Sequence, residues 1–78
     1  MKTYEIFVTA KAGIFDPAGE TSKSALTTLG FEGISSLKIG KFIQLQVEDE
    51  VEDAQVEQMC KKLLANPVIE DFEIKKLS

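Results

Sequence analysis

The chain has 78 residues, of which 44% are hydrophobic and 28% charged, and its formal net charge is −4. This length fits one small domain, so we expect residues 1–78 to fold as a single unit. Proteins that bind nucleic acids concentrate positive charge and use arginine, whereas all nine basic residues here are lysine. We therefore expect neither nucleic acid nor a membrane as a partner, since no apolar run is long enough to span a bilayer.

A domain of this size has a small core that usually needs further support. The single cysteine excludes an internal disulfide, and the absence of histidine argues against a zinc site. Self-association is the remaining source of support. The unpaired Cys60 and the lack of a signal-peptide pattern indicate a reducing, cytoplasmic setting.

Residues 2–10 alternate in character, which predicts a strand with one apolar face. That face carries Tyr4, Ile6, Val8 and Ala10, and the opposite face carries Thr3, Glu5, Phe7 and Thr9. The following loop contains Ile14 and Phe15, which we expect to pack against the core.

Asp16 and Pro17 predict the start of a helix, as N-cap and first helical residue. Its apolar stripe consists of Ala18, Ser22, Ala25, Leu26 and Leu29. Gly30 followed by Phe31 predicts a Schellman motif at its end.

Residues 34–48 alternate again, and two interpretations fit them. Gly40 and Lys41 could form a two-residue hairpin turn, or one long strand could bend near Gly40. We favour the long strand, because it keeps the apolar side chains on one face. Its surplus half would pair with a second copy, in a dimer interface around Gly40, Phe42, Ile43, Leu45 and Val47.

A second helix is expected to begin at Asp49, with an apolar stripe of Val56, Met59, Cys60, Leu63 and Leu64. Asn66 is a candidate left-handed cap, Pro67 stops the helix, and residues 68–77 form the last strand with Phe72 and Ile74 towards the core. These elements predict an α+β two-layer sandwich of order βαβαβ, or βαββαβ if Gly40 is a turn. The sheet would be mainly antiparallel, with both helices covering one face.

The residues offer little chemistry of their own. Without histidine, a serine or cysteine nucleophile lacks its usual base, and Cys60 lies on an apolar stripe. Gly13, Asp16 and Gly19 surround a helix start, but their spacing matches no phosphate-binding motif. We expect no catalytic, cofactor-binding or metal-binding residue in this chain.

Four segments, in order and across nearly the whole chain, together resemble the PurS family. They are Lys11–Gly19, Ala25–Phe31, Leu37–Ile43 and Leu63–Phe72. The chain departs from many members at Lys38, where arginine is common, and its link at Asp49–Asp53 is short. PurS is a small subunit of phosphoribosylformylglycinamidine (FGAM) synthase, an amidotransferase complex of purine biosynthesis.

The resemblance implies a non-catalytic assembly subunit, forming a homodimer or a dimer of dimers. It would bridge a synthetase subunit (PurL), which binds ATP and magnesium, and a glutaminase subunit (PurQ), and could aid ammonia transfer between them. We place hypothetical subunit docking at Gly13, Asp16, Pro17, Gly19, Lys41, Asn66 and Pro67. The chief alternative is a dimeric regulatory domain that binds a metabolite, while an acylphosphatase-like enzyme is disfavoured because the chain lacks arginine.

Overall fold

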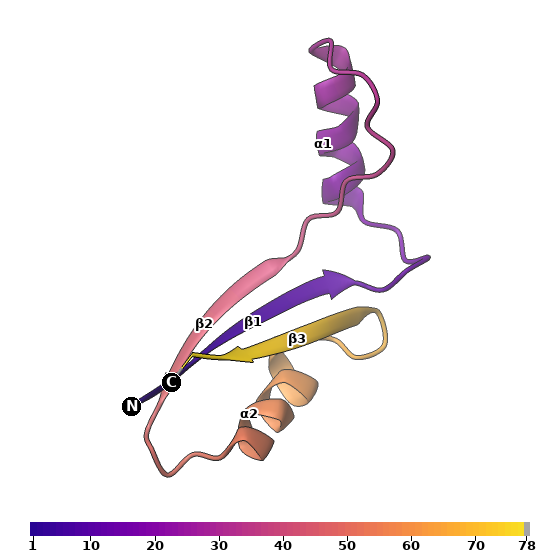
Figure 1. Ribbon diagram of the computed structural model, residues 1–78. Coiled ribbons are helices and arrows are strands. Elements are labelled where there is room, and N and C mark those ends of the chain that lie inside the picture. Colours follow the sequence, from indigo (N-terminus) through magenta and orange to yellow (C-terminus); the bar gives the residue numbers. More distant parts are fainter. Residues whose placement is uncertain (78) are drawn as a thin grey trace.

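The computed structural model describes residues 1–77 and is built around a three-stranded antiparallel sheet (Figure 1). Its elements are β1 (Lys2–Ala10), α1 (Pro17–Thr28), β2 (Lys41–Val47), α2 (Asp53–Met59), the π-helical turn η1 (Cys60–Leu64) and β3 (Glu70–Lys76). The sheet order is β2-β1-β3, so the first strand is central and the other two are edges. The expected α+β class and βαβαβ order are confirmed.

The core forms on the face of β1 that the alternation predicted. Ile6 pairs with Ile43 on one side and Ile74 on the other, and Val8 pairs with Phe72. α2 and η1 cover this face, so that the buried set is Tyr4, Ile6, Val8, Val56, Cys60 and Ala65. Burying each large side chain contributes about 1.5–3 kcal/mol, which makes this short list the main source of folding free energy.

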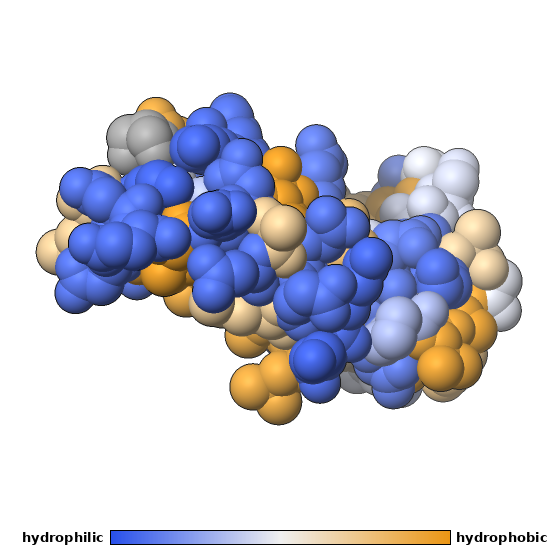
Figure 2. Space-filling view, turned by 90° about the horizontal axis from the view of Figure 1, so that it is seen from below, coloured by the Kyte–Doolittle hydropathy of each residue, from blue (hydrophilic) through white to orange (hydrophobic). Residues whose placement is uncertain are grey.

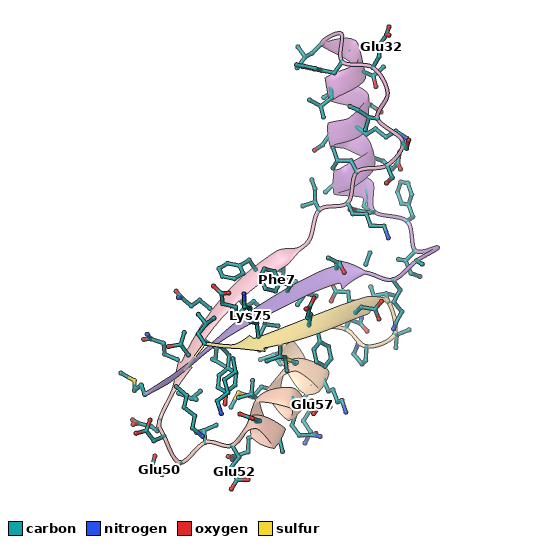
Figure 3. All side chains as sticks on the ribbon, in the orientation of Figure 1. Phe7, Glu32, Glu50, Glu52, Glu57 and Lys75 are labelled. Atoms are coloured by element: carbon teal, nitrogen blue, oxygen red, sulfur yellow. The ribbon has the colours of Figure 1, made fainter. Side chains whose placement is uncertain are left out.

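The opposite face of the sheet is open. Phe7 and Phe42 pair across β1 and β2 there, with ring centroids 5.2 Å apart. Phe7 and Lys75 point away from α2 (Figure 3). The other side chains on this face are mostly polar, which suits contact with solvent.

α1 begins and ends as the sequence predicts. The Asp16 carboxylate accepts a hydrogen bond from the Gly19 amide at 3.1 Å, and Pro17 follows as the first helical residue. At the other end, Phe31 N–H donates to the Leu26 carbonyl and Gly30 N–H to the Thr27 carbonyl, each at 3.1 Å. This is the bonding pattern of a Schellman motif, with Gly30 at a φ of 102°.

The position of α1 differs from the expectation. It projects from one end of the sheet and makes no packing layer with it (Figure 1). Gly19 is its single buried residue, so the expectation that both helices cover one face is wrong for an isolated chain. The molecule is consequently elongated, with extents of 51 × 24 × 14 Å.

The expected strand over residues 34–48 is also only half present. Residues 31–40 have no strand structure and run back beside α1, and β2 begins at Lys41 (Figure 1). Gly40 is therefore neither a bend within a long strand nor a hairpin turn. A Cβ at Gly40 would lie 2.2 Å from the Val8 carbonyl oxygen, so close approach to β1 is what requires glycine here.

α2 starts later than expected. Its N-cap is Glu52, whose amide donates to the Gln55 side-chain oxygen at 2.9 Å in a capping box, whereas Asp49 lies in the preceding loop. Glu50 and Glu52 both lie on that connection before α2 (Figure 3).

η1 changes which residues face the core. Ala65 N–H donates to the Cys60 carbonyl at 2.9 Å, five residues back, and this wider turn shifts the apolar stripe. Leu63 is 83% exposed instead of buried. Asn66 is not left-handed; its side-chain oxygen accepts from the Val68 amide at 3.1 Å instead.

Hydrophobic side chains reach the surface in several separate places on the face seen from below (Figure 2). Phe15, Leu29, Leu63 and Val68 are each more than 70% exposed. Within residues 1–77 no helix has the length and hydropathy needed to cross a membrane.

Candidate docking site

Three connecting segments meet at one end of the sheet, which we call the docking end: residues 11–17, 39–41 and 61–71. They meet because the strands are antiparallel, so the chain leaves β1 where it enters β2 and β3. Lys11 fastens two of them, since its amide donates to the Ile69 carbonyl at 2.9 Å and its ammonium lies 2.7 Å from an Asp71 oxygen.

Asp16 fixes the third segment and the direction of α1. Its two carboxylate oxygens accept hydrogen bonds from the amides of Gly19, at 3.1 Å, and Ile39, at 2.8 Å. These bonds, the one from Ile39 first, lower the pKa of the Asp16 carboxyl. A Cβ at Gly19 would lie 2.3 Å from the Leu37 carbonyl oxygen, so the start of α1 is held tightly against the returning chain.

A first hollow of about 290 Å³ lies between the base of α1 and the sheet. Its lining joins apolar side chains, most of them exposed, to three charged ones, Asp16, Lys41 and Glu70. Ile14 and Phe15 are part of this lining, and Phe15 is 71% exposed. The expectation that this loop packs into the core is therefore wrong, because the core ends at Val8.

A second hollow, of about 370 Å³, shares Lys41 and Glu70 with the first. Three lysines line it: Lys41, Lys61 and Lys62. The Lys41 ammonium lies 3.5 Å from the Leu64 carbonyl oxygen. Lys61 is paired with Glu57 at 3.1 Å, and Glu70 also lines this hollow, so positive and negative groups lie side by side at the docking end.

The structure brings together five of the seven residues predicted for docking. Asp16, Pro17 and Lys41 line the first hollow, and Lys41, Asn66 and Pro67 line the second. The other two do not join them: Gly13 lies in an exposed turn, and Gly19 is buried at the start of α1.

Sequence reasoning missed Lys61, Lys62 and Glu70 as part of this surface. Lysines near the end of a helix are usually explained by the helix dipole, and an acidic pair such as Glu70-Asp71 by solvent exposure, so neither pattern indicates a docking surface. A hydrogen bond from the Asn66 amide to a Glu70 oxygen, at 2.8 Å, ties Glu70 to the turn before β3. The apolar loop residues Ile14 and Phe15 indicated a surface near the start of α1, but nothing in the sequence pointed to these three charged residues.

The residues predicted for a dimer interface divide between the two faces of β2. The side chains of Ile43, Leu45 and Val47 pack, half-buried, against the core beneath α2, and Phe42 lies on the open face. Gly40 is directed at β1. The outer edge of β2 has no neighbouring strand within the sheet that the structure describes.

The titratable groups with shifted pKa values lie mainly in the core or beside it. A hydrogen bond to Asp53 raises the pKa of Tyr4, and burial raises the pKa of the Cys60 thiol. Among residues 1–77 no group of three or more histidine, cysteine or carboxylate side chains is placed to hold a metal ion. The hollows combine apolar surface with scattered charges, an arrangement suited to recognising another protein surface.

Known proteins match the chain over nearly its whole length. The family model for PurS, described as phosphoribosylformylglycinamidine (FGAM) synthase, matches residues 3–78. A phosphoribosylformylglycinamidine synthase subunit PurS from Methanocaldococcus jannaschii is 44% identical over 73 residues, which cover 90% of this chain and 88% of that protein. The chain belongs to the PurS family.

Solved PurS structures share the fold as well as the sequence pattern. A PurS structure from Bacillus subtilis matches with a TM-score of 0.91 at 34% identity, covering 100% of both chains, so the likeness includes the projecting α1. A chain in the structure of PurLQS from Thermotoga maritima matches with a TM-score of 0.83 at 33% identity, covering 97% of this chain and 96% of that one.

Proposed function

We propose that this chain is a non-catalytic assembly subunit of FGAM synthase in purine biosynthesis. The observation that carries the proposal is the match over nearly the whole chain to PurS subunits, one of which comes from a PurLQS complex. In this role the chain holds a synthetase subunit and a glutaminase subunit together, so that ammonia made by one reaches the other. It binds no cofactor itself; ATP and magnesium bind the synthetase subunit.

The shape of the chain supports a role in assembly. A globular protein of 8.6 kDa exposes about 4,700 Å², whereas this chain exposes 5640 Å². Its radius of gyration is 15.9 Å, compared with about 11.5 Å for a compact domain of this length. The excess surface comes with exposed apolar side chains, which is typical of a protein that is covered by partners.

We further propose that the chain forms a homodimer, or a dimer of dimers, through the outer edge of β2. Gly40, Phe42, Ile43, Leu45 and Val47 define this interface. An edge strand presents unpaired backbone groups that a second chain can bind. The docking end, with Asp16, Pro17, Lys41, Asn66 and Pro67, is left for the other subunits. Gly13 and Gly19 act indirectly in this proposal, by shaping the loop and the start of α1. The cytoplasm, where purine precursors are made, is the proposed location.

Reconstitution tests the function directly. Purified synthetase and glutaminase subunits are mixed with formylglycinamide ribonucleotide, ATP, magnesium and glutamine, with and without this chain. Glutamine-dependent product is expected only when the chain is present, whereas free ammonia should support the synthetase without it. Equal glutamine-dependent activity in both mixtures would refute the proposal.

A charge reversal tests the docking end in the same mixture. Lys41→Glu places a negative charge between the two hollows and should lower glutamine-dependent activity at least about tenfold, a loss of roughly 1.4 kcal/mol in assembly. Lys75→Glu, on the open face of the sheet (Figure 3), is the matched control and should keep activity within about twofold. Equal effects of the two variants, with both folded by circular dichroism, would place docking elsewhere.

A further inference from the structure

β3 is the second edge of the sheet and remains able to pair with another strand. The order β2-β1-β3 leaves it with one neighbour, and within residues 1–77 no further strand lies beyond it (Figure 1). It pairs with β1 over all of its seven residues in an unbroken register and contains no proline. Proline, bulges and very short strands usually keep an edge strand from pairing with another chain, and β3 has none of these.

The pairing with β1 determines which backbone groups of β3 face outward. The Leu77 amide donates to the Thr3 carbonyl at 2.9 Å, in the same register as the rest of the strand. Hydrogen-bonded and non-hydrogen-bonded pairs alternate along antiparallel strands, so the odd-numbered residues of β3 bond to β1. Phe72, Ile74 and Lys76 therefore direct their backbone groups away from β1, and an added strand has to bond to them.

The open face of β3 carries two opposite charges, two positions apart. Glu73 and Lys75 are both exposed, and Lys75 points away from α2 (Figure 3). Within residues 1–77 neither takes part in an ion pair, whereas the flanking Asp71 and Lys76 are both engaged in one. The outer edge thus presents a carboxylate and an ammonium group that a partner strand can pair.

A second copy of β3, running antiparallel, satisfies the backbone and the charges together. With Ile74 opposite its own counterpart, Phe72 of each copy lies opposite Lys76 of the other, so the outward backbone groups of residues 72–76 are paired. In the same register Glu73 of each copy lies opposite Lys75 of the other. These are the closely spaced, non-hydrogen-bonded positions, where opposite charges stabilise a sheet. The contact is isologous, as two-fold symmetry requires.

The neighbouring registers fit less well. A shift of one residue sets core-facing side chains against those of the open face. A register centred on Glu73 keeps the faces matched, but it places two like carboxylates directly opposite each other, which is destabilising. It also sets Lys75 against Asp71, whose carboxylate is already paired with Lys11 at 2.7 Å. The register centred on Ile74 is therefore favoured.

We propose that β3 strands of two copies pair antiparallel about Ile74 and so join two homodimers. This rests on the homodimer of the proposed function, and it assigns β2 to the contact within a dimer and β3 to the contact between dimers. Charges on the edge discourage unrelated strands, while their order along β3 admits a second copy. The contact spans residues 72–76 and leaves the docking end uncovered, so glutamine-dependent activity is expected to persist in separate dimers.

Charge reversal and its rescue test the register by sedimentation equilibrium. Glu73→Lys sets two ammonium groups against each other, and Lys75→Glu sets two carboxylates. Each reversal occurs twice per contact, so either variant should weaken the association of dimers at least about tenfold. The combined variant, Glu73→Lys with Lys75→Glu, restores both ion pairs with exchanged polarity and should return the association to within about threefold. Glu50→Lys, in the loop before α2 (Figure 3), adds the same charge as Glu73→Lys and is the control, expected within about twofold.

The outcomes separate this contact from the homodimer through β2. Single variants that associate as the original chain does, or losses that the combined variant does not restore, would overturn the β3 pairing and leave the homodimer standing. Dimers that each single variant converts to monomers, and that the combined variant restores, would retain the β3 pairing and refute the β2 contact. Monomers of the original chain would refute both.

Disulfide cross-linking gives a second test of the register. Residues opposite each other at a non-hydrogen-bonded position have Cα atoms about 4.5 Å apart, within the range that a disulfide spans. A mixture of Glu73→Cys and Lys75→Cys chains, oxidised after exchange of copies, should yield at least about fivefold more covalent dimer than Glu73→Cys alone. Native Cys60 is buried and stays in place. An equal or greater yield from Glu73→Cys alone would contradict the register centred on Ile74.

Discussion

Asp53 is the clearest electrostatic contact between the sheet and the second helix. The buried Tyr4 hydroxyl donates a hydrogen bond to its carboxylate, and the Lys76 ammonium lies 3.4 Å from the same oxygen. The hydrogen bond from Tyr4, followed by Lys76, lowers the pKa of Asp53. Asp16 is the second carboxylate with a lowered pKa, through backbone amides, and it plays the corresponding part at the base of α1.

We expect the free energy of unfolding to depend on pH through these two groups. Because folding lowers the pKa of Asp53 below its usual 3.8, the stabilisation is present above that pH and is lost as the pH falls through the folded-state value. Asp53→Asn should therefore flatten the decline in stability below about pH 4, measured by urea unfolding at several pH values. Glu50→Gln, in the loop before α2 (Figure 3), is the control; an unchanged slope in Asp53→Asn would contradict the assignment.

At the scale of the elements, two glycines determine how α1 and the returning segment, residues 31–40, join the sheet. Gly19 allows α1 to touch the returning chain, and Gly40 allows that chain to come close to Val8 of β1 just before β2 begins. Neither has a positive φ among the glycines of the described chain, so close approach and not backbone conformation is the reason for both. η1 has a similar local effect, because one wider turn transfers Leu63 from the core to the surface.

Adding one methyl group at Gly40 should therefore be costly. Gly40→Ala would place a Cβ 2.2 Å from the Val8 carbonyl oxygen, a backbone atom of the central strand that cannot move aside. We expect a loss of about 1–3 kcal/mol in the free energy of unfolding, measured by urea denaturation. Ser36→Ala, exposed in the same returning segment, should cost less than about 0.5 kcal/mol. Equal stability of the two variants would show that β1 and the Gly40 backbone lie farther apart.

At the scale of the whole molecule, the chain has a small packed part, the sheet with α2 and η1, and an extended part, α1 with residues 31–40, that packs little against the rest. Within residues 1–77, six buried hydrophobic residues form the core between the sheet and α2–η1, while α1 and the returning segment add surface and little burial. Such a chain gains more from association than a compact domain of the same length, since the open part is where apolar surface remains to be buried.

The thermal midpoint should accordingly rise with protein concentration. For a dimer that unfolds as it dissociates, a tenfold increase in concentration stabilises the folded state by about 1.4 kcal/mol and raises the midpoint by roughly 3–6 °C. Circular dichroism or calorimetry between about 5 and 500 μM measures this shift. A midpoint independent of concentration over that range would exclude coupled folding and association.

The amino-acid sequence by itself determined the parts of the fold that depend on local physics. Alternation in residues 2–10 gave the buried face of β1, and Asp16-Pro17 and Gly30-Phe31 gave both ends of α1 within a residue. The resemblance in four segments gave the family, which the match over residues 3–78 confirms. The buried face of β1 and the two ends of α1 can be predicted because each depends on neighbours within a few positions along the chain.

Only the tertiary structure decided where α1 points, where β2 begins and which way Leu63 faces. Each depends on a contact between distant residues or on a single unusual turn: Asp16 with Ile39, Gly40 with Val8, and Ala65 with Cys60. An apolar stripe predicts that one face of a helix is buried, but it does not predict whether the same chain or another chain buries it. That is why periodicity predicted a helix on its own sheet, whereas the structure directs the same helix outward.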